Sequence, residues 1–217
     1  MKEGGHHGAW AQLERGELTL EQFYEPFAAE VTSLAGPGKE PVTGDVIKEF
    51  MDTLTKGLSR TNPDLMEAVA RLKKAGLKVA VLTNNWKSEK AERLLFKDID
   101  MFDEVVESCL VGMRKPEETI YQHTLDLLGV QAEEAVFLDD LGHNLKPADK
   151  MGIATIQVKD VITALGELQT LVNIDLGVTP GTSGIRKGME IDESRLQQFF
   201  KDNNLLGSCG KTSYLHT

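Results

Sequence analysis

Two adjacent carboxylates, Asp139 and Asp140, follow a short apolar run in the stretch VFLDDLGHNLKPADK, residues 136–150. The apolar residues are of the β-branched and aromatic type, which predicts a buried strand that ends at the two acids. In an open α/β sheet, ligands bind beyond the carboxyl ends of the strands, so the pair is well placed to hold a hard cation. A plainer interpretation is a strand-end turn followed by a helix N-cap, which needs only one Asp.

A second polar group follows another apolar run, in the stretch LKVAVLTNN. Thr83, Asn84 and Asn85 supply a hydroxyl and two carboxamides at the end of this predicted strand. Such groups can hold phosphate oxygens together with backbone N–H groups. Thr and Asn are also common in turns and at helix N-caps, so this stretch alone does not establish a site.

Lys115 stands before Pro116 in the stretch GMRKPEETIY. A residue before proline avoids the helical conformation, which places the lysine in an extended segment just ahead of a predicted helix. There its ammonium could offset both the paired aspartates and a phosphate. A lysine taken alone is more often solvated, so the prediction depends on the order of the three stretches along the chain.

The segments around these residues alternate between strand and helix patterns. Strands are predicted at 77–85, 104–107, 136–139 and 153–158, and helices at 63–75, 88–96, 117–128, 146–151 and 161–171. Strands separated by helix-length segments indicate βαβ crossovers and therefore a parallel sheet. We expect a doubly wound α/β fold with the polar stretches at the carboxyl ends of its strands.

The chain before residue 62 shows helical patterns and no strand. Thr19 and Gln22 match a capping box at the start of a helix that runs to about Val31, and another helix is expected around residues 46–54. The predicted organisation is a helical cap at 1–61, an α/β core at 62–178, and a linker with a disordered tail at 179–217.

Composition and charge exclude several classes of function. The 217 residues carry a formal net charge of −10, which argues against general binding to nucleic acid or to an anionic membrane surface. No apolar run approaches the length of a membrane span, and the N-terminal residues contain no apolar signal core. Cys109 and Cys209 are far apart and lack metal-type spacing, which favours a reducing compartment.

The order strand-Thr-Asn, Lys-Pro, strand-Asp-Asp resembles motifs two, three and four of the haloacid-dehalogenase-like (HAD) superfamily, whose members are mostly magnesium-dependent phosphatases. Within it, the chain is similar to the N-terminal domains of soluble epoxide hydrolases and, more closely, to that of a multidomain acyl-CoA dehydrogenase family protein. The likeness runs from residue 3 to about 201 and is carried by EGGHHGAW, VLTNN, VVESC, KPEETIY, FLDDLGHNLK and RKGMEID.

The resemblance implies a Rossmann-like parallel sheet, a helical cap that closes over the substrate, and a small-molecule phosphate ester as that substrate. It implies that Thr83 and Asn84 bind the phosphate and that Lys115 neutralises the phosphate and the nucleophile. Asp139 and Asp140 would anchor Mg²⁺ directly or through water, while Asn144 would help to order the site. The resemblance also implies kinase-like and acyl-CoA dehydrogenase domains in a longer parent protein, in mitochondria or peroxisomes.

One departure from the family pattern bears on activity. Family members begin with a strand that ends in an Asp-x-Asp motif, whose first Asp is the nucleophile that becomes an aspartyl-phosphate. Residues 1–18 contain no Asp, and the nearest later match, LVNIDLGV at 171–178, offers only Asp175. We therefore expect a sheet that lacks its usual first strand and has two unpaired strand edges, which would favour dimers or aggregation.

Two explanations of this departure remain open. The sequence is either an N-terminally incomplete piece of a longer protein or a short form in which residues 171–178 fill the empty strand position. Two functions follow: a phosphohydrolase module whose own turnover is weak or absent, or a non-catalytic module that binds phosphate and Mg²⁺ or a protein. A dehalogenase is disfavoured, because paired aspartates suit a metal and halide chemistry in this superfamily is metal-free.

Overall fold

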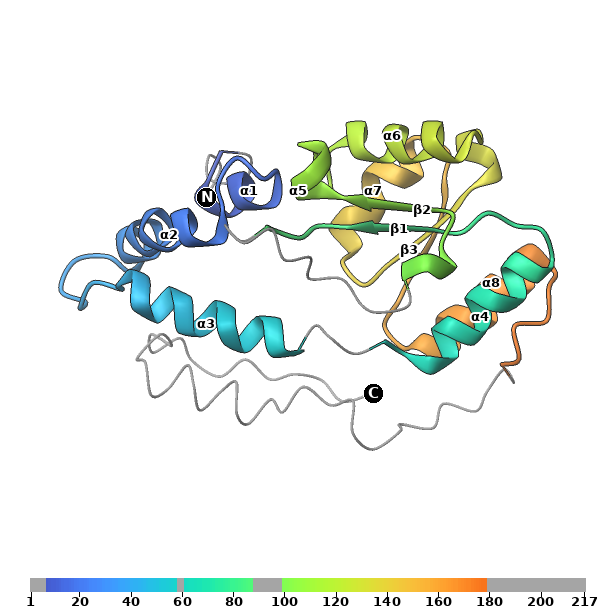
Figure 1. The fold of residues 1–217 in the computed structure, drawn as a ribbon, viewed down its shortest axis with the longest axis horizontal. Coiled ribbons are helices and arrows are strands. Elements are labelled where there is room, and N and C mark those ends of the chain that lie inside the picture. The colour runs from blue at the N-terminus through green and yellow to red at the C-terminus, as the bar shows by residue number, and fades with distance from the viewer. Residues whose placement is uncertain (1–6, 58–60, 88–98, 179–217) are drawn as a thin grey trace. The chain divides into compact units, whose positions relative to one another are not determined.

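The computed structural model of the chain describes residues 7–57, 61–87 and 99–178, all within one compact unit, Met1–Thr182 (Figure 1). Helices occupy the described chain as far as Lys74, and strands alternate with helices from Ala80 onward. The predicted α/β class with a helical N-terminal region is therefore confirmed. The helix predicted at 88–96 and the tail predicted at 179–217 lie outside the described residues, and the division into cap and core stays a prediction.

Three helices form the N-terminal region: α1 (Ala9–Glu14), α2 (Leu20–Ala35) and α3 (Gly44–Gly57). The predicted capping box opens α2, since Gln22 N–H donates to Thr19 Oγ1 and Thr19 N–H donates to Gln22 Oε1. Amphipathic faces of the helices enclose an apolar core in which Phe23 and Met51 are fully buried. None of the helices within the described ranges has the length and apolarity that a bilayer crossing requires.

Helices and parallel strands alternate through the rest of the described chain. Pro63 occupies the first turn of its helix, as predicted, with the Asn62 side chain as N-cap. The elements in order are α4 (Pro63–Lys74), β1 (Ala80–Thr83), a 3₁₀ turn (Ile99–Met101), β2 (Glu104–Glu107), α5 (Ser108–Val111), α6 (Glu118–Leu128), a 3₁₀ turn (Ala132–Glu134), β3 (Val136–Asp139), α7 (Gly142–Lys150), β4 (Ala154–Gln157) and α8 (Val161–Val172).

The helix predicted from Lys146 begins four residues earlier, at Gly142. Gly142 is a weak helix former, and Pro147 lacks the N–H that an interior position normally donates, so both residues favoured a later start. The Asp139 carboxylate contacts this earlier start, since it accepts hydrogen bonds from Leu141 N–H, just before the helix, and from the Asn144 side chain in its first turn.

The strands form two separate two-stranded parallel sheets, β1 with β2 and β3 with β4 (Figure 1). Leu82 C=O accepts from Lys115 Nζ, which also binds Asp139 of β3, so Leu82 and, by alternation along the strand, Ala80 face away from β2. Asp139 C=O accepts from Val158 N–H on the β4 side, which leaves Leu138 facing away. The expected interruption of the sheet therefore lies between β1 and β3 in the part of the chain that the structure describes.

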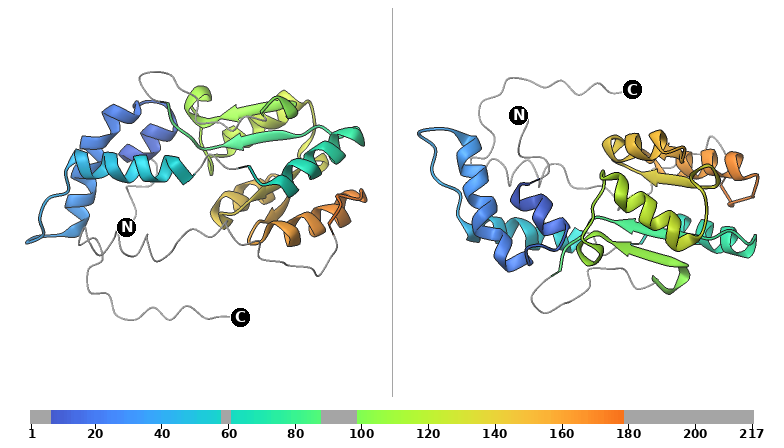
Figure 2. Two further views of the ribbon diagram at one scale, coloured as in Figure 1. Left: turned by 60° about the horizontal axis from the view of Figure 1, so that its bottom comes forward. Right: turned by 90° about the horizontal axis from the view of Figure 1, so that it is seen from above.

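Helices cover the strands on two faces. Helices α4 and α8 pack side by side over one apolar core with side chains of β3 and β4, whereas α6 and α7 enclose a second core with β2 (Figures 1 and 2). Leu82 contributes to the second core together with Phe137, which brings β1 and β3 close to each other. Both residues remain partly exposed, although the inner strands of such a sheet are normally buried on both faces.

The interruption predicts an alternating pattern of amide exchange along β1. The amides of Ala80 and Leu82 should exchange at least about tenfold faster than those of Val81 and Thr83, because alternation along a parallel strand makes the latter the donors to β2. Residue-level hydrogen–deuterium exchange by NMR measures this ratio, and β1 serves as its own control. Equal protection along the strand would contradict an open edge.

Candidate functional site

Lys115 lies between the carboxyl ends of β1 and β3. Its Nζ donates to Leu82 C=O at 3.0 Å and to Asp139 Oδ2 at 2.7 Å, and it lies 5.5 Å from the centroid of the Phe137 ring. Lys115 is only 9% exposed and Asp139 only 7%, so this is a buried ion pair rather than the solvated surface lysine of the plainer interpretation. The structure therefore brings together residues of all three predicted stretches.

Asp139 uses both carboxylate oxygens within the protein. While Oδ2 accepts from Lys115, Oδ1 accepts from Leu141 N–H at 2.8 Å and from Asn144 Nδ2 at 2.9 Å. Asn144 is itself buried, and its C=O accepts from the Tyr121 hydroxyl at 2.7 Å. Burial and, to a smaller extent, the negative charge of Asp139 raise the pKa of Tyr121, which keeps that hydroxyl protonated as the donor.

Asp140 differs sharply from its neighbour. It is exposed, and its carboxylate makes no hydrogen bond or ion pair with any of the described residues, although its C=O accepts from Gln157 Nε2. The described ranges contain no group of three or more Asp, Glu, His or Cys side chains that could enclose a metal. Mg²⁺ commonly binds one or two protein carboxylates and takes its other ligands from water and phosphate. The exposed carboxylate of Asp140 could therefore serve as such a ligand.

Thr83 and Asn84 end β1 beside Lys115, but their side chains differ in availability. Among the residues that the structure describes, the Thr83 hydroxyl makes only a long contact, 3.4 Å to Asn84 C=O. The Asn84 carboxamide is fully engaged: its Oδ1 accepts from Lys115 N–H at 2.9 Å, and its Nδ2 donates to Lys115 C=O at 3.0 Å and to Glu14 at 3.3 Å. Any further hydrogen bond from Asn84 to a phosphate would have to come from its main chain, and its phosphate-binding role stays a prediction.

Sequence reasoning missed Glu14 and Arg114, which lie behind the lysine. Glu14 in α1 is 7% exposed and accepts from both Arg114 Nε and Asn84 Nδ2. The next residue, Arg15, pairs with Glu117 at 3.1 Å. No short motif marks these pairs, because their partners are about a hundred positions apart in the sequence. The one local signal was the pattern of opposite charges at 14–15 and at 114–117.

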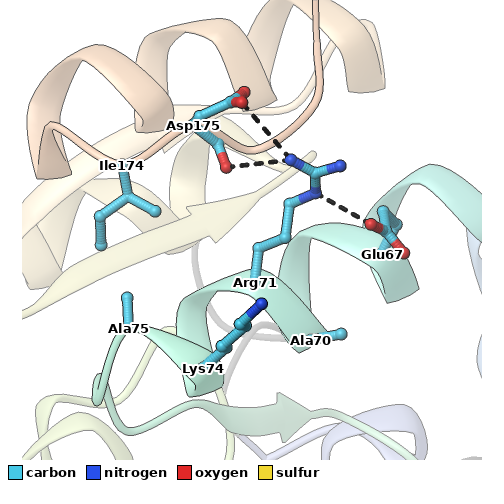
Figure 3. A pocket seen from close by; sticks show the side chains of 7 residues that line it. All are labelled: Glu67, Ala70, Arg71, Lys74, Ala75, Ile174 and Asp175. Atoms are coloured by element: carbon cyan, nitrogen blue, oxygen red, sulfur yellow. Dashed lines mark hydrogen bonds and ion pairs between the residues drawn. The ribbon is translucent and has the colours of Figure 1, made fainter.

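Residues 171–178 do not fill the interrupted sheet, so this candidate for the empty strand position is wrong. Val172 ends α8, the following residues form no strand, and Leu176 is buried in the core of α4 and α8. Asp175 instead pairs with Arg71, which also binds Glu67, at a surface pocket of about 520 Å³ (Figure 3). None of the residues that line this pocket belongs to the three predicted stretches.

Comparison with known proteins gives consistent results. Residues 14–158 match the family model of haloacid dehalogenase-like hydrolases. The chain is 38% identical over 208 residues to acyl-CoA dehydrogenase family member 10 of Mus musculus and 38% identical over 189 residues to bifunctional epoxide hydrolase 2 of Sus scrofa. These alignments cover 94% and 83% of the chain but only 19% and 33% of the relatives, so it spans a fifth to a third of their length.

The fold is also similar to solved structures. A HAD family enzyme from Bacteroides thetaiotaomicron, solved as a complex with magnesium and inorganic phosphate, has a TM-score of 0.52 and 23% sequence identity. The match covers 72% of this chain and 78% of that one. At this level of identity the likeness concerns the fold alone.

The same substitution at the two adjacent acids should have effects of very different size. Asp139→Ala should lower the free energy of unfolding by about 3 kcal/mol or more, because it leaves the buried Lys115 ammonium without its carboxylate. Asp140→Ala, at an exposed position, should change it by less than about 0.5 kcal/mol. Urea denaturation of both variants measures the difference, and equal losses would contradict the assignment of the buried counter-ion to Asp139.

Proposed function

The chain belongs to the haloacid dehalogenase-like hydrolase family, and we propose that it is a magnesium-dependent phosphohydrolase module that acts on a small phosphate ester. The observation that carries the proposal is the Lys115 ammonium, held 2.7 Å from Asp139 between the ends of β1 and β3. Thr83 ends β1, and Asp140 directly follows the last residue of β3. A cation, a hydroxyl and an exposed carboxylate at one sheet edge suit a phosphate with its metal.

Each residue has a distinct role in this proposal. Lys115 neutralises the phosphate, and the Thr83 hydroxyl with the main chain of Asn84 binds its oxygens. Asn144 holds Asp139 in the orientation that faces Lys115. Asp140 anchors Mg²⁺, with Asp139 beside it as a partner through water, because Asp139 already uses both oxygens. The metal, when bound, would neutralise charge on the phosphate.

Covalent phosphoryl transfer in this family needs a nucleophilic carboxylate, and no described acid suits that task. Asp139 is committed to Lys115, Asp140 is assigned to the metal in this proposal, and Asp175 lies at the separate pocket beside Arg71. We therefore propose that this chain by itself has very weak or no phosphatase turnover. We also propose that the chain forms part of a longer protein with kinase-like and acyl-CoA dehydrogenase domains. A homodimer that forms through the unpaired strand edges is a further proposal.

A non-catalytic module that binds phosphate and Mg²⁺ is the second candidate. It is favoured by the same observation that argues against turnover, namely that the charged framework around Lys115 is complete without a nucleophile. Such a module would hold an anion at the lysine and leave it unchanged.

Thermal unfolding beside a phosphatase assay tests both candidates. Mg²⁺ and inorganic phosphate together should stabilise the chain, by about 2.7 kcal/mol at a ligand concentration a hundredfold above Kd, while hydrolysis of p-nitrophenyl phosphate stays at background. Asp140→Ala is the matched control and should lose the Mg²⁺-dependent part of the stabilisation. Saturable Mg²⁺-dependent hydrolysis that Asp139→Asn abolishes would contradict the proposed lack of turnover, and absence of stabilisation would contradict binding.

A further inference from the structure

The main chain of Lys115 is held on both sides by one carboxamide. Asn84 Oδ1 accepts from Lys115 N–H at 2.9 Å, and Asn84 Nδ2 donates to Lys115 C=O at 3.0 Å. Two hydrogen bonds from a planar amide fix both the position and the rotation of the peptide groups on either side of the lysine Cα. The direction in which the side chain leaves the backbone is therefore set by Asn84.

Glu14 in turn holds the carboxamide. Its Oε2 accepts a hydrogen bond from the second Nδ2 hydrogen of Asn84 at 3.3 Å. The same oxygen accepts from the Nε of Arg114, which is the residue directly before Lys115. The Glu14 and Arg114 side chains are only 10% and 12% exposed, so the pair is largely shielded from water. One carboxylate thus restrains the lysine through Asn84 on one side and through the preceding residue on the other.

Helix α1 carries this carboxylate from the N-terminal region to the site. At its start, Ala9 N–H donates to Glu30 of α2 at 2.8 Å. At its end, Gly16 has φ +69° and packs so closely on the carbonyl oxygen of Cys109 that a Cβ there would clash with it. Both ends of the helix are therefore fixed, one to the helical region and one to the α/β core.

We propose that Glu14 is a positioning residue, which acts through Asn84 and Arg114 to aim the Lys115 ammonium between Leu82 and Asp139. The proposal rests on the proposed phosphate site, because its purpose is to present the ammonium to an anion. It assigns to the N-terminal helical region a part in building the site, in addition to covering it. In this proposal Glu14 acts only through Asn84 and Arg114, without binding the metal or the phosphate itself.

Three variants separate positioning from general support. Glu14→Ala removes the acceptor for Asn84 and the partner of Arg114, whereas Glu14→Gln keeps an acceptor oxygen for Asn84 and removes the charge. Arg15→Gln is the matched control, since it breaks the ion pairs of the residue next to Glu14, with Glu17 and Glu117, and leaves Asn84 untouched.

The direct readout is amide exchange at Lys115, measured by NMR against Thr163 N–H, which donates to the Asp160 carboxylate at the start of α8 and contacts neither Glu14 nor Asn84 in any hydrogen bond among the described residues. Glu14→Ala should raise the exchange rate of Lys115 about tenfold relative to Thr163, and Glu14→Gln should restore most of the protection. Calorimetry with Mg²⁺ and inorganic phosphate should show an affinity about tenfold weaker for Glu14→Ala, and unchanged for Arg15→Gln.

Two results would overturn the proposal. Lys115 exchange that is unchanged in Glu14→Ala would mean that Asn84 needs no support from α1. An equal rise of the Lys115 exchange rate in Arg15→Gln would mean that the ion pairs of Glu14 and Arg15 only hold α1 against the α/β core. If the unmodified chain binds no phosphate, the proposed function fails, but the exchange rates still decide whether Glu14 positions the lysine.

Discussion

The buried ammonium of Lys115 is the constraint on which the rest of the site depends. A charge shielded from water is costly unless it is paired and hydrogen-bonded, and here Asp139 and Leu82 C=O provide both kinds of partner. These partners belong to different two-stranded sheets. Within the described residues, the Lys115 ammonium therefore bridges the two sheets, through a hydrogen bond to β1 and an ion pair with β3, at a place where no backbone ladder joins them.

This pairing also gives the two neighbouring aspartates different properties. Two adjacent carboxylates would repel each other strongly if both were buried, but Asp139 is neutralised by Lys115 and Asp140 is exposed. The site thus presents a shielded positive charge and, one residue away from its counter-ion, an open negative one. That combination suits a phosphate accompanied by a divalent cation better than either partner alone, because each charge of the ligand then has a counterpart in the protein.

Local signals in the sequence were sufficient for most of the fold. The capping box of Thr19 and Gln22, Pro63 in the first turn of a helix, and the apolar runs before Thr83 and Asp139 all depend on near neighbours, and the structure contains each of them. The start of α7 was missed because it depends on the Asp139 carboxylate, which accepts hydrogen bonds from the residues that open the helix.

The candidate site was only partly predictable, for a related reason. The sequence order indicated that Lys115 and Asp139 would meet, since strand ends of a parallel sheet share one edge. It gave no indication that the Asn84 carboxamide would hydrogen-bond to the main chain of Lys115, or that Glu14 would accept a hydrogen bond from Asn84. These contacts join residues 31 and 70 positions apart in the sequence. Residues 171–178 have a strand-like pattern, but burial of Leu176 against α4 and α8 uses their apolar side chains elsewhere.

Binding and turnover are separable in this architecture. The groups proposed to attract an anion, Lys115 with its supports Asn84 and Glu14, are held by contacts among described residues that include no additional acid. Turnover needs one more carboxylate close to the lysine, and the open edges of β1 and β3 adjoin that position. Lys115 donates one of its hydrogen bonds to the neutral C=O of Leu82. A carboxylate that entered this position could accept that hydrogen bond in place of Leu82 C=O. Electrostatics at the lysine thus favour the addition of an acid at the place where covalent catalysis would require it.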